Sequence, residues 1–243
     1  YGIQQATGAG SNLLCINNMI SGVRSAGAGT DQNIAAGLSV SSFLSSGDRY
    51  FHNSVLLDGN DGSSSPTARS AAFELPSPLP SGLKMRNNIF SNATTFSAAG
   101  THAFALYTPS AAWPSADTSN YNNLHAAGPQ AAVGYFNGSA RTGLPDWQSA
   151  TGQDGASVSG DPLFVSSTNL HISTGSSIAS NIGSPVTGVN QDIDGEARNV
   201  LAPDLGADEF SSSHITISVP ISSGWYMVSN PVVRGSGTDS VQQ

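Results

Sequence analysis

The chain has 243 residues and a formal net charge of -8, a length that allows one substantial core or one long repeat array. Charged residues make up only 10% of the chain, against roughly 25% in an ordinary globular domain. The 8 Lys and Arg residues are scattered singly, which argues against a nucleic-acid surface. No run of about 18 apolar residues occurs, so no membrane-spanning helix is expected.

Short stretches in which apolar residues alternate with small or polar ones recur in the first half of the chain. Such period-two patterns predict strands with one buried face, here at residues 37–40, 72–75 and 103–106. Clusters of Gly, Ser, Asn and Pro separate these stretches and predict turns. No amphipathic helix of convincing length is expected anywhere.

An asparagine accompanies each repeat at a nearly constant interval. The positions are Asn17, Asn53, Asn87 and Asn122, which lie 36, 34 and 35 residues apart. Helical repeats of this length need Leu and Ala at helical spacing, which this sequence lacks. A parallel β-helix fits better, because equivalent positions stack at about 4.8 Å and inward asparagines can form a hydrogen-bonded ladder. Ordinary turns are the alternative explanation for the asparagines.

Cys15 is the lone cysteine and cannot form an internal disulfide, so we expect it in the core rather than as a reactive thiol. The sequence opens at Tyr1 without a signal peptide, as expected for a processed secreted protein or an excised fragment.

Residues 127–160 break the repeat, and we interpret them as a loop insertion. Loops that project from a solenoid often carry function. Four aromatic residues are candidates for a platform that binds sugar rings, and they are Trp113, Tyr135, Phe136 and Trp147. The alternative is that these rings plug the edge of the solenoid.

From Asp161 onward the chain carries a series of distinctive motifs. They are Asp161-Pro162-Leu163-Phe164-Val165, Leu170-His171-Ile172, Ser184-Pro185, Asp192-Ile193-Asp194-Gly195-Glu196-Ala197-Arg198 and Pro203-Asp204-Leu205-Gly206-Ala207-Asp208-Glu209, preceded by Tyr121-Asn122-Asn123-Leu124, Tyr135-Phe136-Asn137-Gly138 and Asp146-Trp147-Gln148. Over residues 117–210 the chain resembles the last rung and C-terminal cap of secreted right-handed parallel β-helix repeat proteins of Bacteroidota-like bacteria. The resemblance implies a fold and an origin but no single activity, because these proteins include adhesins, surface-layer components and polysaccharide-active enzymes.

The predicted fold class is therefore all-β, a right-handed parallel β-helix with a short C-terminal β extension. Residues 1–210 form the β-helix, with residues 161–210 as its C-terminal cap. Residues 211–243 are predicted to be a linker and a strand tail, too short for a core of their own. The apolar tail residues that could add strands to a neighbour are Ile215, Ile217, Val219, Trp225 and Met227.

Acidic residues offer two candidate calcium sites but no convincing catalytic set. Asp58 and Asp61 lie in a Gly-rich loop, and Asp192 and Asp194 precede a Gly turn. Neither stretch completes an EF-hand pattern, and the resemblance implies that Asp192 or Asp194 pairs with Arg198 in a structural cap. Acidic and basic residues within the repeats do not recur in register, which makes an enzyme less favoured than a non-catalytic protein.

No cap is predicted before the first rung, so the N-terminal end of the stack is expected to expose unpaired strand edges. The leading hypothesis is a secreted or cell-surface structural or adhesive β-helix that assembles head-to-tail into extracellular filaments. The alternative is a carbohydrate-binding or polysaccharide-degrading module of the lyase or hydrolase type that uses the aromatic loop.

Overall fold

The computed structural model describes residues 1–6, 11–24, 34–42, 44–100, 102–173 and 177–210. The described residues up to 210 belong to one compact unit. The predicted linker and tail at residues 211–243 lie outside the described residues, so their role stays a prediction. Within the described ranges, no helix is long and apolar enough to cross a membrane.

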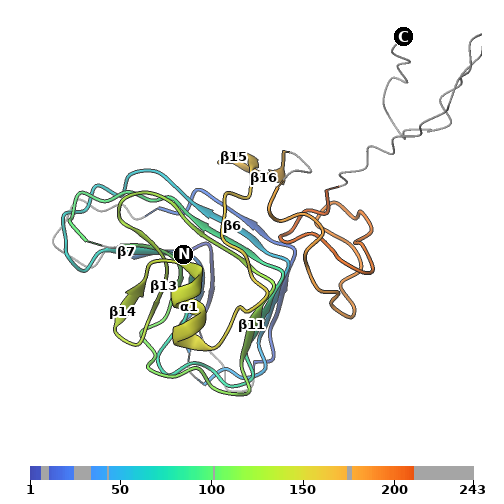
Figure 1. Ribbon diagram of the computed structural model, residues 1–243, viewed down its shortest axis with the longest axis horizontal. Coiled ribbons are helices and arrows are strands. Elements are labelled where there is room, and N and C mark those ends of the chain that lie inside the picture. Colours follow the sequence, from blue (N-terminus) through green and yellow to red (C-terminus); the bar gives the residue numbers. More distant parts are fainter. Residues whose placement is uncertain (7–10, 25–33, 43, 101, 174–176, 211–243) are drawn as a thin grey trace, which may run out of the picture. The chain divides into compact units, whose positions relative to one another are not determined.

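Three sheets surround a common interior, and each sheet takes one strand from every turn of the chain (Figure 1). Sheet A contains β1 (Ile3–Gln5), β4 (Ile34–Val40), β7 (Arg69–Glu74), β10 (Ala103–Tyr107), β13 (Ala131–Phe136) and β14 (Ser139–Arg141). Sheet B contains β2 (Leu14–Ile16), β5 (Arg49–Phe51), β8 (Lys84–Arg86) and β11 (Thr118–Asn120). Sheet C contains β3 (Met19–Ile20), β6 (Ser54–Leu57), β9 (Ile89–Asn92) and β12 (Asn123–Ala126).

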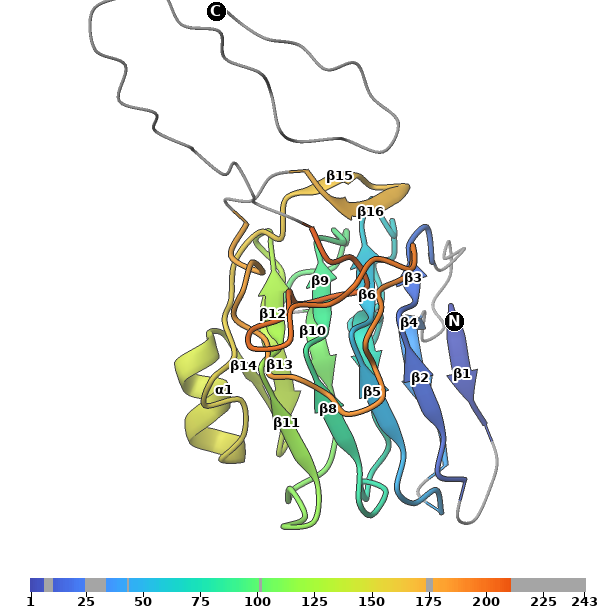
Figure 2. The same ribbon diagram turned by 90° about the vertical axis from the view of Figure 1, so that its right-hand side faces the viewer.

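The strands of each sheet pair in parallel, apart from β14, which pairs antiparallel with β13. One passage of the chain through sheets A, B and C is termed a rung, and the successive rungs are β1–β3, β4–β6, β7–β9 and β10–β12. Figure 2 shows the rungs side by side. The predicted parallel β-helix is confirmed, and the strands predicted at 37–40, 72–75 and 103–106 correspond to β4, β7 and β10.

The core consists of columns of inward-facing side chains, because parallel pairing in register stacks equivalent residues of successive rungs. The columns are Ile3, Leu38, Phe73 and Leu106 in sheet A, Cys15, Tyr50 and Met85 in sheet B, and Ile20, Val55, Phe90 and Leu124 in sheet C. The Phe73 ring links the sheets, with its centroid 4.7 Å from that of Tyr50 and 5.3 Å from that of Phe90. Burial raises the pKa of the Cys15 thiol to about 11, in keeping with its expected place in the core.

A two-residue corner joins sheet B to sheet C in every rung. Its first residue is always left-handed, with φ values of 54°, 53°, 58° and 55° at Asn17, His52, Asn87 and Tyr121. The second residue is always asparagine, and its side chain points into the stack. A ladder of amides results, in which Nδ2 of each asparagine donates to Oδ1 of the next at 2.8 to 3.0 Å, through Asn18, Asn53, Asn88 and Asn122.

The predicted ladder is therefore present, but two of its four members need correction. Asn53 and Asn122 belong to it, whereas Asn17 and Asn87 occupy the left-handed position one residue earlier. The pairs Asn17-Asn18 and Asn87-Asn88 have an amide at both positions, so the sequence alone does not distinguish the inward residue from the outward one.

Helix α1 (Leu144–Thr151) covers the far end of the stack together with β14. It starts after Gly143 with Pro145 in its first turn and ends at Gly152, whose φ of 69° is left-handed. The sequence did not predict this short helix, because eight residues are too few to show a clear helical period of apolar residues.

The predicted insertion at 127–160 also starts too early, because β13 is a regular member of sheet A. Ala131 of β13 pairs with Ala103, 28 residues before it, whereas Ala103 pairs with Ser70, 33 residues before it. Because the spacing between β10 and β13 is shorter than the spacing between β7 and β10, the sequence repeat did not reveal β13 as a member of sheet A. Only the residues after β13, with β14 and α1, depart from the regular winding.

Residues 161–210 begin with the hairpin of β15 (Phe164–Ser166) and β16 (Asn169–Ile172) and run back across the corner between sheets B and C (Figure 2). They contact corner residues of successive rungs at Asn17, Ser54 and Asn87. This corrects the prediction of a cap over the end of the stack. The reason is an apolar outer surface at the corner, where Ile89 packs against Leu205 in a buried cluster.

The amide ladder predicts a strong effect of Asn88→Ala. The Asn88 side chain bonds to the backbone and side chain of Asn53, to Tyr50 O and to Asn122 Oδ1, and it is 0% exposed. We expect a loss of about 3 kcal/mol in the free energy of unfolding, because each unpaired buried polar group costs about 1 to 3 kcal/mol. Urea unfolding at pH 7 measures it. Asn18→Ala, at the partly exposed end of the ladder, is the control and should cost about 1 kcal/mol; equal losses would contradict the ladder's role.

From the close packing of Gly134 against Trp147 at the far end of the stack, we expect Gly134→Ala to destabilise the fold. A Cβ at Gly134 would lie 2.2 Å from Cε3 of Trp147, the buried side chain of α1. We expect a loss of about 2 kcal/mol from this overpacking. Gly155→Ala is the matched control, since a Cβ there meets nothing within 4 Å. Thermal unfolding of both variants tests the contact, and an unchanged melting temperature for Gly134→Ala would contradict it.

Candidate functional site

The four aromatic residues of the predicted sugar platform do not gather on one surface. Trp147 and Phe136 are 0% and 3% exposed and pack with Trp113 under α1, with ring centroids 6.0 to 6.4 Å apart. The indole nitrogen of Trp147 donates to the buried carboxylate of Asp154 at 2.8 Å. These three rings plug the end of the solenoid, which is the alternative that the sequence left open.

Tyr135 lies on the opposite, outer face of β13. Its ring stacks on that of Tyr107 with centroids 4.7 Å apart and an interplanar angle of 16°. The guanidinium of Arg69 lies 4.4 Å from the centre of the Tyr107 ring and pairs with Glu74 at 2.7 Å. Tyr107 thus has a tyrosine on one side of its strand and an arginine on the other, an aromatic ladder across neighbouring strands that stabilises sheet A.

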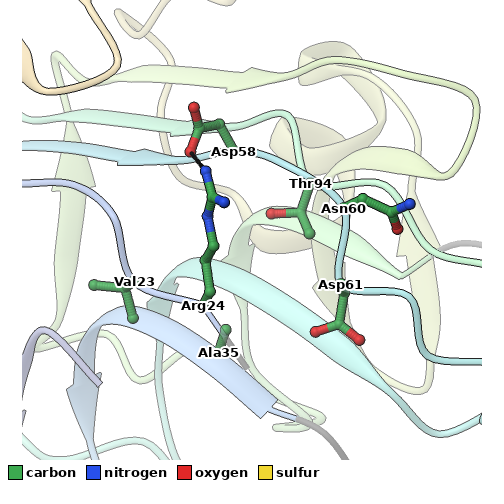
Figure 3. A pocket seen from close by; sticks show the side chains of 7 residues that line it. All are labelled: Val23, Arg24, Ala35, Asp58, Asn60, Asp61 and Thr94. Carbon is green, nitrogen blue, oxygen red and sulfur yellow. Dashed lines mark hydrogen bonds and ion pairs between the residues drawn. The ribbon is translucent and has the colours of Figure 1, made fainter. Parts of the chain in front are cut away.

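The positively charged side chain of Arg24 already lies against the first predicted calcium loop. Arg24 points toward Asp58 and pairs with it at 3.3 Å, whereas the Asp61 carboxylate points in a different direction (Figure 3). Asp61 Oδ1 accepts the backbone N–H of Ser63 at 3.2 Å, and burial raises the pKa of Asp61 above its usual value. The structure thus does not bring the two predicted carboxylates together as a pair of ligands.

The two carboxylates of the second predicted calcium site, Asp192 and Asp194, also bond to different partners. Both oxygens of Asp192 accept backbone N–H groups: Oδ1 those of Asp194 and Glu196 at 2.9 and 2.8 Å, and Oδ2 that of Glu209 at 2.9 Å. Asp192 therefore organises a turn. Asp194 points away to His171, whose Nε2 lies 2.8 Å from Asp194 Oδ2.

Arg198 holds the C-terminal segment against the first rung, with a different partner from the predicted one. Its buried guanidinium pairs with Glu209 at 3.2 Å rather than with Asp192 or Asp194. It also donates to Asn17 Oδ1 at 2.8 Å. The outward amide of Asn17 is thus a docking point for a segment 181 residues away in sequence.

Asn87 has the same role two rungs further along. Its Nδ2 donates to Ser184 O at 2.7 Å, and its Oδ1 accepts the Ser184 N–H at 3.0 Å. Gly206 approaches the corner closely, since a Cβ there would lie 2.5 Å from Ser54 Oγ. Sequence analysis missed these docking residues, and the signal that could have found them is the pair of asparagines at two of the corners, Asn17-Asn18 and Asn87-Asn88.

His52 occupies the left-handed corner position between Asn17 and Asn87, and it is 0% exposed. Burial and the nearby Arg198 charge lower the pKa of His52 to about 3. Its Nε2 lies 2.8 Å from Nδ2 of Asn87, which donates to it, so the ring is neutral. A neutral histidine at this contact makes docking of the C-terminal segment sensitive to acid.

The first rung is the end of all three sheets in the described part of the chain, where β1, β2 and β3 are the terminal strands. Ile3 belongs to the inward column of Leu38 but is 36% exposed, against 1% for Leu38. Leu14 and Tyr1 are 47% and 55% exposed at the same end. The inward column is therefore more exposed at this rung than at the next.

The buried neutral His52 predicts acid sensitivity that His52→Asn removes. Because the folded pKa is about 3 and the reference value 6.5, the unfolded chain takes up the proton first as the pH falls. The contribution of His52 is fully present above pH 6.5 and is lost toward pH 3. From pH 7 to pH 5 the parent should lose about 2 kcal/mol through this residue, at about 1.4 kcal/mol per pKa unit.

Asparagine occupies the equivalent corner position at Asn17 and Asn87, so the variant should fold. Burial raises the pKa of Asp204 to about 7, an effect of opposite sign that both proteins share. Urea unfolding of parent and variant at pH 7 and pH 5 gives the change in the free energy of unfolding for each protein. The difference between these two changes is the contribution of His52. Identical pH dependences would contradict the assignment.

Comparison with known proteins finds no similar family or structure. No family model matches the sequence, and no curated protein or solved structure matches it. The kinship with secreted bacterial β-helix proteins therefore stays a prediction from the motifs of residues 117–210, whereas the β-solenoid fold itself is established.

Proposed function

We propose that this chain is a non-catalytic structural or adhesive β-helix that associates with a second copy through its first rung. The observation that carries the proposal is the exposed first rung, where the three sheets terminate together in the described part of the chain and Ile3 of the core column is 36% exposed. Terminal strands present unpaired N–H and C=O groups, which another strand can satisfy. A location at the cell surface or outside the cell rests on the sequence resemblance.

A second copy of the chain is the partner that this end fits. Its first rung offers strand edges with the same spacing and the same exposed apolar side chains, at Tyr1, Ile3 and Leu14. Contact between two identical surfaces is two-fold symmetric and closed. A hydrophobic contact backed by strand pairing is also compatible with the low charge of the chain.

The far end of the stack does not offer a matching surface. Trp147 of α1 lies against Gly134, and Asn123 of β12 forms a parallel bridge with Val158. A simple head-to-tail stack therefore lacks its second open edge within the described residues. Growth into filaments needs a further contact, and we propose the tail at 211–243 as its source, by addition of strands to a neighbour.

The carbohydrate-binding or polysaccharide-degrading alternative has no specific observation in its favour. Three of the four predicted platform rings pack inside the end of the solenoid, and Tyr135 stacks on Tyr107. The structural and adhesive role remains the better supported proposal.

The proposal predicts that Leu14→Lys abolishes self-association. The equivalent positions of the next rungs are Arg49 and Lys84, so a lysine at this outward position is compatible with the fold. We expect the parent to show a concentration-dependent dimer in sedimentation velocity and the variant to remain monomeric, because each chain would bring a positive charge to the rim of an apolar contact.

Leu201→Lys is the matched control, since Leu201 is 83% exposed in the C-terminal segment, and it should dimerise like the parent. A parent that stays monomeric at the highest accessible concentration would overturn the proposal. So would a Leu14→Lys variant that associates as strongly as the parent.

A further inference from the structure

Three potential metal ligands from different parts of the C-terminal segment meet at one point. They are His171 of β16, Asp194 after the Asp192 turn, and Asp208 near the end of the segment, and one ligand atom of each lies within 4.8 Å of the others. The side chains of His171 and Asp194 are 40% and 51% exposed, whereas Asp208 is 7% exposed. The cluster is thus anchored on a buried carboxylate and open to solvent on one side.

The imidazole of His171 has an oxygen in front of each of its ring nitrogens. Nδ1 contacts Asn169 Oδ1, which also accepts the backbone N–H of His171 at 3.2 Å, so this amide atom is an acceptor. Nε2 lies 2.8 Å from Asp194 Oδ2. A neutral ring can donate to only one of these oxygens. A metal ion bound at Nε2 makes both contacts favourable, because Nδ1–H then donates to Asn169 Oδ1 while Asp194 Oδ2 faces the same ion.

The buried Asp208 adds a second negative group at the same place. Its Oδ2 accepts the Ile172 N–H at 2.8 Å, which holds the carboxylate in place. Two carboxylates this close repel each other, and a shared cation relieves that repulsion. One oxygen of the Asp208 carboxylate lies within 4.8 Å of the ligand atoms of His171 and Asp194, so this mostly buried side chain presents a ligand to the cluster.

We propose that His171, Asp194 and Asp208 bind a first-row divalent transition-metal ion such as Zn²⁺. Imidazole with carboxylates suits these ions, whereas Ca²⁺ takes oxygen ligands only. Three protein ligands leave a coordination position for water. The metal binds Nε2 of the neutral ring, while Nδ1–H donates to Asn169 Oδ1 and orients the ring.

The ion would join three parts of the segment that docks on the solenoid: the β15–β16 hairpin, the Asp192 turn and the stretch at Asp208 near its end. Its expected effect is to stabilise the docked segment. The three proposed ligands are different residues from those proposed for self-association, so metal binding and self-association are tested by separate variants.

The test is isothermal titration of metal-free, untagged full chain with ZnCl₂, and the same titration with CaCl₂. We expect one Zn²⁺ per chain and no comparable binding of Ca²⁺. Zn²⁺ should also raise the melting temperature, since a ligand that binds only the folded state stabilises it. Asp194→Asn and His171→Gln should each weaken Zn²⁺ binding at least tenfold, and Asn169→Ala by about tenfold through loss of ring orientation.

Two controls separate the site from general binding by acidic or histidine side chains. Asp146→Asn changes an aspartate of similar exposure, 44% against 51% for Asp194, and His214→Gln changes a histidine outside the described residues. Both should bind Zn²⁺ like the parent. Absence of saturable one-to-one binding would overturn the proposal, as would equal affinity in Asp194→Asn and the parent or an equal preference for Ca²⁺.

Discussion

The stacked amides at the corner between sheets B and C are the interaction on which the rest of the structure depends. Asn18, Asn53, Asn88 and Asn122 hold successive rungs in register, because each amide has one correct neighbour above and one below. The ladder ends on the buried carboxylate of Asp154, which accepts from Asn122 at 3.1 Å and from the Trp147 indole at 2.8 Å. One network of polar groups therefore sets both the rung spacing and the closure of the far end.

The same corner also positions the C-terminal segment. Its left-handed first residue turns a side chain outward at the point where the next residue turns inward, so Asn17, His52 and Asn87 form an outer row beside the inner ladder. The outer row meets Arg198, Ser184 and Gly206. Docking of residues 161–210 is thus a consequence of the backbone geometry that the ladder requires, and its polar contacts are specific because they are buried.

The two ends of the stack differ in a way that bears on function. Trp147 is buried at one end, while Ile3 of the first rung is 36% exposed at the other. Association is therefore proposed at the first rung, through Tyr1, Ile3 and Leu14. The metal proposal uses other residues, His171, Asp194 and Asp208, so variants at the two sets of positions test the two proposals separately.

The parallel β-helix could be predicted from the sequence, because a repeat near 35 residues with alternating strands and a corner asparagine has few other solutions. The prediction also placed Asn53, Asn122 and Cys15 correctly in the interior. Which amide of Asn17-Asn18 and of Asn87-Asn88 faces inward could not be predicted, since that depends on which residue adopts the left-handed conformation. Only the tertiary structure decided that Trp147 closes the core and that residues 161–210 lie along a corner, because local sequence does not encode which distant surface is left uncovered.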